Sequence, residues 1–277
     1  MVPQGGERTA LAQAGERNLR AYTVAFCAAG EGQIQRGPDA TLTAFPHTYW
    51  VNGVVSPRLP ETGTVAQLDR ILTWFRELKR EVWVHVGPYS EPADLAQVLR
   101  TRSLHNHHNR PMMVCDFAEL VTGFPLPEGV TIEPLDDYHI SATHPHPILR
   151  RANTPRLRAV FSAKQEFADA DPRRTRTFVA WLDDKPVGVG IVFLSQGNAG
   201  IYDVEVLEPL RGRGIGTALL QAICVFARDQ GAGLISLAAS EQGAGFYPKF
   251  GFFRVGRWPT YTNSMAKQRR DSQEARP

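Results

Sequence analysis

The sequence is poor in the features that mark several common classes of protein. It contains only 3 cysteines among 277 residues, too few and too widely separated for a disulfide framework or a zinc site. No apolar run reaches the roughly 18 residues that a membrane-spanning helix needs. No basic start followed by an apolar segment marks a secretory leader. These absences predict a soluble cytoplasmic protein that neither enters a membrane nor holds a metal.

Strong charge of one sign is absent as well. The formal net charge is only +3, because 31 basic residues are interspersed with 28 acidic ones. Without a concentrated positive field, a nucleic-acid partner is not expected. A hydrophobic content of 43% is enough for a sizeable core, and the length suits one large domain or two small ones.

The most informative segment is a glycine-rich, doubly basic turn. Residues 200–206 alternate and are rich in β-branched side chains, which predicts a strand, and residues 217–229 carry apolar side chains at helical spacing. The turn between them reads Arg211-Gly212-Arg213-Gly214-Ile215-Gly216, followed by Thr217. Its glycines can direct several N–H groups into one concavity at a helix N-terminus, and its arginines add full charges. The segment therefore predicts a phosphate or pyrophosphate site.

The pattern R-x-x-G-x-G differs from the G-x-x-x-x-G-K-[ST] and G-x-G-x-x-G phosphate motifs. With its surroundings it resembles the acetyl-CoA pyrophosphate loop of the GNAT family of N-acetyltransferases. Residues 234–239 predict the next strand, and residues 243–252 resemble the family's segment of an aromatic residue followed by Tyr-x-x-x-Gly-Phe. The resemblance thus covers loop, helix, strand and tyrosine segment in the family's order.

One order of elements occurs twice along the chain. The first series is strand 48–55, helix 65–80, strand 81–86, helix 91–101 and strand 112–117; the second is strand 200–206, helix 215–230, strand 234–239, short helix 243–249 and strand 252–258. The repetition predicts two copies of one α/β unit, although coincidental alternation of strands and helices would give the same pattern. The expected fold class is α/β, or α+β with a mixed sheet, comprising two GNAT-like domains that are each a twisted mixed sheet flanked by helices.

The two copies differ at the turn. Residues 56–64 contain one glycine, two prolines and one arginine, so they lack the repeated N–H donors that a pyrophosphate needs. We therefore expect a degenerate GNAT-like domain followed by a catalytic one. The predicted divisions are a flexible N-terminus at 1–20, the degenerate domain at 21–124, a linker at 125–129, the catalytic domain at 130–265 and a disordered tail at 266–277.

The resemblance implies roles for three residues near the turn. In the family, backbone N–H groups of the strand before the loop polarise the thioester carbonyl, and Val204 and Val206 occupy the matching positions. Tyr247 lies where the family commonly places the acid that protonates the departing thiolate. The alternative for Tyr247 is a core tyrosine that packs beside Phe246.

Asp203 and Glu205 occupy alternate positions of the same predicted strand, so both are expected on one face. An alkyl amine with a pKa of about 10 must lose a proton before it can attack. Either carboxylate could accept that proton through a water or bind the cationic amine. The alternative is that both are exposed strand carboxylates with no role in catalysis.

The histidines are weaker candidates. Those within residues 105–108 are expected in a solvated loop rather than at a metal. Those within residues 139–146 fall where the family commonly has helices that border the acceptor pocket, so one of them could contact the substrate or act as the base. Residues 155–167 predict a helix that walls the same cleft.

The function implied by the resemblance is transfer of an acetyl group from acetyl-CoA to a primary amine of a small molecule or peptide. The amine would attack directly, without a covalent enzyme intermediate. A non-catalytic acyl-CoA-binding or sensing module and a transferase for a longer acyl group are the alternatives. The sequence leaves open whether the first half covers the active domain as a lid or forms a homodimer interface.

Overall fold

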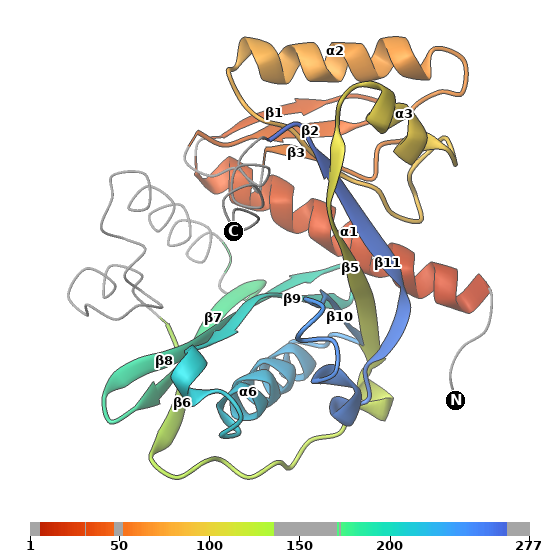
Figure 1. Ribbon diagram of the computed structural model, residues 1–277. Helices are drawn as coiled ribbons and strands as arrows, with labels where there is room; N and C mark the ends of the chain where they lie inside the picture. The colour runs from red at the N-terminus through yellow and green to blue at the C-terminus, as the bar shows by residue number, and fades with distance from the viewer. Residues whose placement is uncertain (1–5, 31, 47–51, 136–170, 172, 265–277) are drawn as a thin grey trace, which may run out of the picture.

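The structure is a computed structural model, and it describes residues 6–30, 32–46, 52–135, 171 and 173–264 (Figure 1). The first half contains α1 (Gly6–Ala29), β1 (Gln33–Arg36), β2 (Thr41–Ala44), β3 (Gly53–Val55), α2 (Thr64–Glu77), β4 (Trp83–His85), α3 (Leu95–Thr101), β5 (His105–Asp116) and the 3-10 turn η1 (Phe117–Glu119). The second half contains β6 (Val130–Pro134), β7 (Thr175–Leu182), β8 (Lys185–Ser195), β9 (Asn198–Val206), η3 (Glu208–Leu210), α6 (Ile215–Asp229), β10 (Leu234–Ala238), η4 (Tyr247–Phe250) and β11 (Phe253–Thr262).

The described strands join one mixed sheet in the order β1-β2-β3-β4-β11-β5-β10-β9-β8-β7-β6. Two strands are exchanged at its centre, because β11 lies between β4 and β5 of the first half and β5 lies between β11 and β10 of the second. The pairs β3–β4 and β9–β10 are parallel, and the three pairings between them are antiparallel. The prediction of a mixed sheet flanked by helices is confirmed. The two predicted domains share one continuous sheet, which is joined at β11 and β5.

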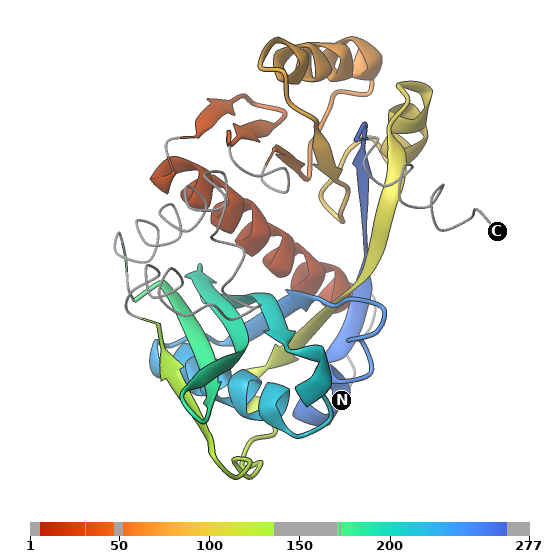
Figure 2. The ribbon, with the colours of Figure 1, turned by 60° about the vertical axis from the view of Figure 1, so that its left-hand side comes forward.

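The first helix corrects the expectation of a flexible N-terminus at 1–20 for residues 6–20, while residues 1–5 lie outside the described part of the chain. α1 begins at Gly6, and its buried residues are Ala12, Gly15, Glu16, Asn18, Tyr22, Thr23, Phe26 and Cys27. Polar residues are prominent among them, so the helix lacks the apolar stripe that signals burial in a sequence. Gly15 permits the close approach, since a Cβ there would collide with the Met112 side chain of β5. Figures 1 and 2 show α1 running diagonally between the two halves.

The remaining long helices cover the other face of the sheet. Val54 of β3 belongs to the core beneath α2 and α3, whereas its neighbour Val55 packs with Ala12 of α1. Likewise Ile201 belongs to the core beneath α6, whereas Tyr202 packs with residues of α1. Because successive strand residues point to opposite faces, α1 occupies one face of the sheet and α2, α3 and α6 occupy the other.

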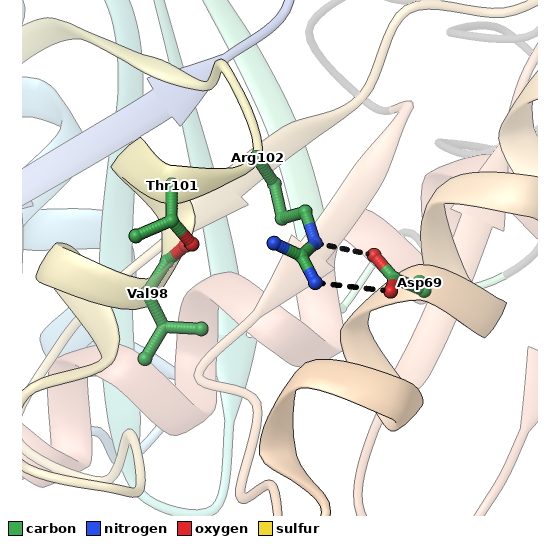
Figure 3. Close-up of polar contacts among 4 residues, drawn as sticks. All are labelled: Asp69, Val98, Thr101 and Arg102. Carbon is green, nitrogen blue, oxygen red and sulfur yellow. Dashed lines mark hydrogen bonds and ion pairs between the residues drawn. The ribbon is translucent and has the colours of Figure 1, made fainter.

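An ion pair joins α2 to the end of α3. The Arg102 guanidinium donates to both carboxylate oxygens of Asp69, at 2.7 and 3.2 Å, and the Thr101 hydroxyl donates to the Val98 carbonyl at 2.7 Å (Figure 3). The pair is largely exposed, so the buried core beneath the helices, rather than this contact, holds them in place.

The histidines of residues 105–108 lie on β5, and the prediction of a solvated loop is wrong. This polar run becomes a strand because β11 pairs along it, with Thr260 opposite His108 and also opposite His85 of β4. His85 Nδ1 lies 3.0 Å from the Thr260 hydroxyl. Burial lowers the pKa of His85 to about 4 and that of His108 to about 3. Within the described residues, no group of His, Cys, Asp and Glu side chains could hold a metal ion.

The length and hydropathy of the helices show whether any of them could span a membrane. None of those in the described part of the chain is both long enough and apolar enough to cross a bilayer.

Glu16 carries a buried carboxyl on α1, with only 1% of its surface exposed. One oxygen accepts a hydrogen bond from the Tyr89 backbone N–H at 2.9 Å, and the other accepts from the Ser56 hydroxyl. Desolvation raises the pKa of Glu16 from its ordinary 4.5 to about 7, although the Tyr89 bond and the charges of Arg20 and Arg17 oppose the shift. The carboxyl is therefore about half protonated at neutral pH.

This raised pKa makes stability depend on pH. The folded protein holds a proton that the unfolded chain releases above pH 4.5, so the contribution of Glu16 falls between pH 4.5 and about 7, by up to about 3 kcal/mol. Glu16→Gln mimics the protonated group, so its stability relative to the wild type should rise across this interval. Urea unfolding of both proteins at about pH 5 and about pH 8 measures the change. The histidines titrate equally in both proteins, so an identical difference at the two pH values would contradict the prediction.

Candidate functional site

The glycine-rich turn connects β9 to α6 and has the backbone that the sequence predicts. Gly212 has a φ of 77°, and Gly214, the N-cap of α6, has a φ of 83°. Both values lie in the left-handed region that glycine adopts without strain. No side chain caps the first turn of α6, whose leading N–H groups have no partner within the helix. Together with the helix dipole, these donors attract an anion.

The side chains of the turn are divided between solvent and core. Arg211 and Arg213 are exposed, and Arg211 Nε donates to the Val206 carbonyl at 3.1 Å. Ile215 is buried with 2% exposure and fixes the turn to the core. A Cβ on Gly216 would lie 3.6 Å from the Val206 side chain. The turn therefore presents two cations from a rigid base at the end of β9.

Lys249 brings a further positive charge to the first turn of α6, and the sequence analysis missed it. Its Nζ donates to the Thr217 hydroxyl at 2.7 Å. The same Nζ lies 4.7, 5.2 and 5.4 Å from the ring centroids of Phe246, Phe250 and Phe124. A cation at a helix N-terminus is opposed by the helix dipole, and the aromatic faces offset that cost. An anion held at the turn would gain a third positive partner.

The strand before the turn loses its neighbour halfway along. β9 pairs with β10 only from Asn198, opposite Leu234, to Ile201, opposite Leu237. Residues 202–206 continue alongside β8 but have no partner on β10. Val204 and Val206, predicted to supply N–H donors, lie in this parted segment. The edge of β9 that has parted from β10 is where backbone donors can meet a ligand's carbonyl.

A bulge at Asp203 bends the parted segment. Asp203 has a φ of 52°, and the register with β8 shifts between Val189 and Ile191. Tyr202 packs on the α1 face, whereas Val204 packs on the α6 face against the position of Gly190, so regular alternation is broken at Asp203.

That break removes the basis for expecting Asp203 and Glu205 on one face. Both carboxylates are exposed, which the non-catalytic alternative requires and a catalytic role also allows. A non-glycine residue in the left-handed region is strained and is a reason to look for function.

Tyr247 opens η4, on the chain that follows β10. It is 9% exposed and contacts Phe246 and Phe252, with ring centroids at 5.2 and 5.7 Å. Burial raises the pKa of the phenol, which therefore keeps its proton at neutral pH. The residue thus has the core contacts of the structural alternative and the protonation state of an acid.

In the first half, the corresponding segments stay joined by backbone hydrogen bonds. Beyond β3 and β4, Glu91 N donates to the Pro57 carbonyl at 2.9 Å and Leu59 N donates to the Glu91 carbonyl at 3.0 Å. α2 also begins at a left-handed glycine, Gly63. A cavity of about 550 Å³ beside it is lined by Glu61 and other residues, including a second acidic one. Paired strands and negative charge make this an unsuitable place for a phosphate-bearing ligand.

Two other regions bear on the predictions. A mostly apolar groove of about 560 Å³ lies between α6 and strands β6 and β7, and its lining on α6 begins at Ala218. The candidate histidines of residues 139–146 and the predicted helix at 155–167 lie outside the described residues.

The family comparison identifies the second half. The acetyltransferase (GNAT) family model matches residues 143–252. This chain carries a GNAT acetyltransferase domain. The match includes the bulged strand, the glycine turn and Tyr247, and it implies acyl transfer from an acyl-CoA. The GNAT resemblance found in the sequence is confirmed.

Solved structures share the GNAT fold over most of the chain. A GCN5-related N-acetyltransferase from Kribbella flavida has a TM-score of 0.67 at 15% identity, covering 88% of this chain and 94% of that one. One from Sphaerobacter thermophilus has a TM-score of 0.59 at 18% identity, covering 87% and 90%. A tandem GNAT protein from the clavulanic acid biosynthesis pathway has a TM-score of 0.60 at 17% identity, covering 80% and 77%. These likenesses confirm the tandem GNAT-like fold, whereas no curated protein matches the chain.

The two helix-capping glycines provide a matched test of the turn. Gly214→Ala and Gly63→Ala place the same methyl group at left-handed N-cap positions, at a backbone cost of about 1 kcal/mol each. The methyl group at 214 also lies 3.1 Å from the Pro127 side chain, whereas that at 63 has nothing within 4 Å. Only Gly214→Ala should weaken binding of coenzyme A, by roughly tenfold or more if one N–H contact is lost. Isothermal titration calorimetry measures both affinities. Equal affinities of the two variants would remove the turn from the cofactor site.

Proposed function

We propose that the protein is an N-acetyltransferase that uses acetyl-CoA, and that only its second half is active. The proposal rests on two features that lie side by side in that half. An uncapped glycine turn with positive charges adjoins a strand that has parted from its neighbour. The proposed acceptor is a primary amine of a small molecule or peptide.

The residues divide the work as follows. The N–H groups of 212–217 hold the pyrophosphate, with Arg211, Arg213 and Lys249 as counter-charges. The backbone N–H groups of Val204 and Val206 would donate to the thioester carbonyl and stabilise negative charge on its oxygen. Acetyl-CoA supplies the activated acyl group, and the protein supplies position, charge and protons.

Proton movements complete the proposed reaction. Asp203 or Glu205 takes the proton of the ammonium group, directly or through a water, and frees the lone pair that forms the new C–N bond. As the C–S bond breaks, Tyr247 donates its proton to the sulfur. After the C–N bond has formed, the nitrogen loses its second proton, which restores Tyr247, and the carboxylate releases the first proton to solvent. The products are an amide, coenzyme A and one proton.

Direct attack is favoured over a cysteine-linked intermediate. Cys27, Cys115 and Cys224 are all buried and free. Desolvation raises the pKa of Cys27 to about 11 and those of Cys115 and Cys224 to about 12. A thiol must ionise and reach the substrate to act as a nucleophile, and none of the three meets that requirement.

Calorimetry with acetyl-CoA and an amine screen test the proposal together. We expect calorimetry to show one cofactor site per chain. With at least one amine, we expect release of free coenzyme A, which a thiol reagent detects. Binding without turnover on any amine would favour the acyl-CoA-binding module, and turnover only with longer acyl groups would favour that second alternative. Two sites would mean that the first half is active as well. No binding would contradict the proposal.

Tyr247→Phe tests the proposed acid. Loss of the phenol should reduce kcat by roughly a hundredfold, the usual range for one acid–base group, with little change in the affinity for acetyl-CoA. Tyr261→Phe is a matched control, because Tyr261 of β11 is 4% exposed in the core beneath α2 and α3, and its hydroxyl accepts from Arg100 at 3.3 Å. If both variants kept the wild-type kcat, Tyr247 would be a packing residue only.

Asp203 combines a charge with a strained backbone, and two substitutions separate them. Asparagine tolerates the left-handed region better than alanine does. If the charge matters, Asp203→Asn should lower kcat/KM for the amine by roughly tenfold while leaving thermal stability nearly unchanged. If only the bulge matters, Asp203→Asn should be active and Asp203→Ala should lose stability. Steady-state kinetics and thermal unfolding of both variants give the answer.

A further inference from the structure

Asn18 of α1 makes a buried contact with the strand that carries the proposed oxyanion donors. It is 1% exposed, and its Nδ2 donates to the carbonyls of Phe193 at 3.0 Å and Asn198 at 2.8 Å. Its Oδ1 accepts from the Tyr202 hydroxyl at 2.6 Å. The amide thus uses both N–H bonds and its oxygen on β8 and β9, which belong to the other half of the chain.

The surroundings of this contact leave little freedom. Tyr202 stacks on Tyr22 of α1, with ring centroids 4.0 Å apart and planes 8° from parallel. Gly200 is required beside them, because a Cβ there would collide with Asn18 Oδ1 and with the Tyr202 ring. Burial raises the pKa of Tyr202 well above its ordinary value, so its hydroxyl remains a donor at any physiological pH.

The contact lies where β9 remains paired with β8 but has parted from β10. Pairing with β10 ends at Ile201, and the register with β8 shifts across Asp203. Tyr202 is therefore the first residue of the parted segment and directly precedes the bulge. Without β10 on that side, a hydrogen bond and a stacked ring from α1 replace the restraint that a neighbouring strand would provide.

We infer that Asn18 is a positioning residue, which fixes the parted segment of β9 through Tyr202 so that the N–H groups of Val204 and Val206 hold their direction. This inference rests on the proposed function for its catalytic consequence. It also gives the first half a role. Its own strands stay joined, and it supplies the helix α1 that aligns the parted segment of β9.

α1 can act in this way because it is held firmly from the other side. Two residues before Asn18, the Glu16 carboxyl accepts from Ser56 and Tyr89 of the first half. Next to it, Arg17 donates to the Tyr89 hydroxyl at 2.6 Å. One turn of α1 thus binds the first half with one side and β9 with the other.

Tyr202→Phe is the sharpest test, because it removes one hydroxyl and keeps the stacked ring. We expect faster hydrogen exchange at the amides of 203–206 in the folded protein. We also expect kcat to fall about five- to tenfold, as for the loss of one hydrogen bond, with KM for acetyl-CoA within about twofold, since the glycine turn is untouched. Asn18→Leu should have the same effects, and the double variant should lose little more than either single one.

Thr23→Val on α1 is the control for general destabilisation. Thr23 is 6% exposed, and its hydroxyl donates within the helix, to the Leu19 carbonyl at 2.9 Å. It should lower the melting temperature without changing exchange at 203–206 or kcat well below that temperature.

The outcomes are distinguishable from those that test the proposed function. Wild-type exchange and kcat in folded Tyr202→Phe would overturn the inference, as would equal effects of Thr23→Val. If the wild type acetylates no amine, the proposed function fails, and hydrogen exchange alone then decides whether Asn18 positions β9.

Discussion

The antiparallel pairing of β5 with β11 is the interaction on which the rest of the molecule depends. It extends from Val114 opposite Phe253 to His105 opposite Thr262. Since each strand completes the sheet of the other half, the two halves share one twisted surface rather than meeting at a side-chain interface. The concave face of that surface receives α1, which therefore contacts both halves along its length. Backbone hydrogen bonds, which are difficult to remodel, thus fix where one half lies relative to the other.

The duplicated fold is used asymmetrically. In the second half, β9 and β10 part and a positively charged turn adjoins the gap. In the first half, the corresponding segments are joined through Glu91, and a carboxylate from α1 occupies the nearby interior. The joined strands make the first half a support for the parted, strained segment of β9 in the second half. The same architecture therefore gives a candidate site in one half and a structural support in the other.

The sequence was informative where structure is determined by near neighbours. The left-handed conformations of Gly212 and Gly214 follow from the glycines themselves, and the helix after them from its own periodicity. Features set by distant partners were not predictable. The buried face of α1 depends on polar residues such as Asn18, whose partners lie 175 to 184 positions away. The bulge at Asp203 arises from a mismatch with β8, and Lys249 reaches the turn only because η4 folds back over α6.

The exchanged strands also determine when the central sheet can form, because β11 is the last of the described strands to be synthesised. During synthesis, β4 and β5 emerge long before β11, which must enter between them. Until then the first half has two unpaired strand edges at its centre, and α1 lacks the part of the sheet formed by β8 and β9. Exposed edges of this kind invite pairing with other chains. Separate expression of either half would therefore leave a sheet with a missing central strand.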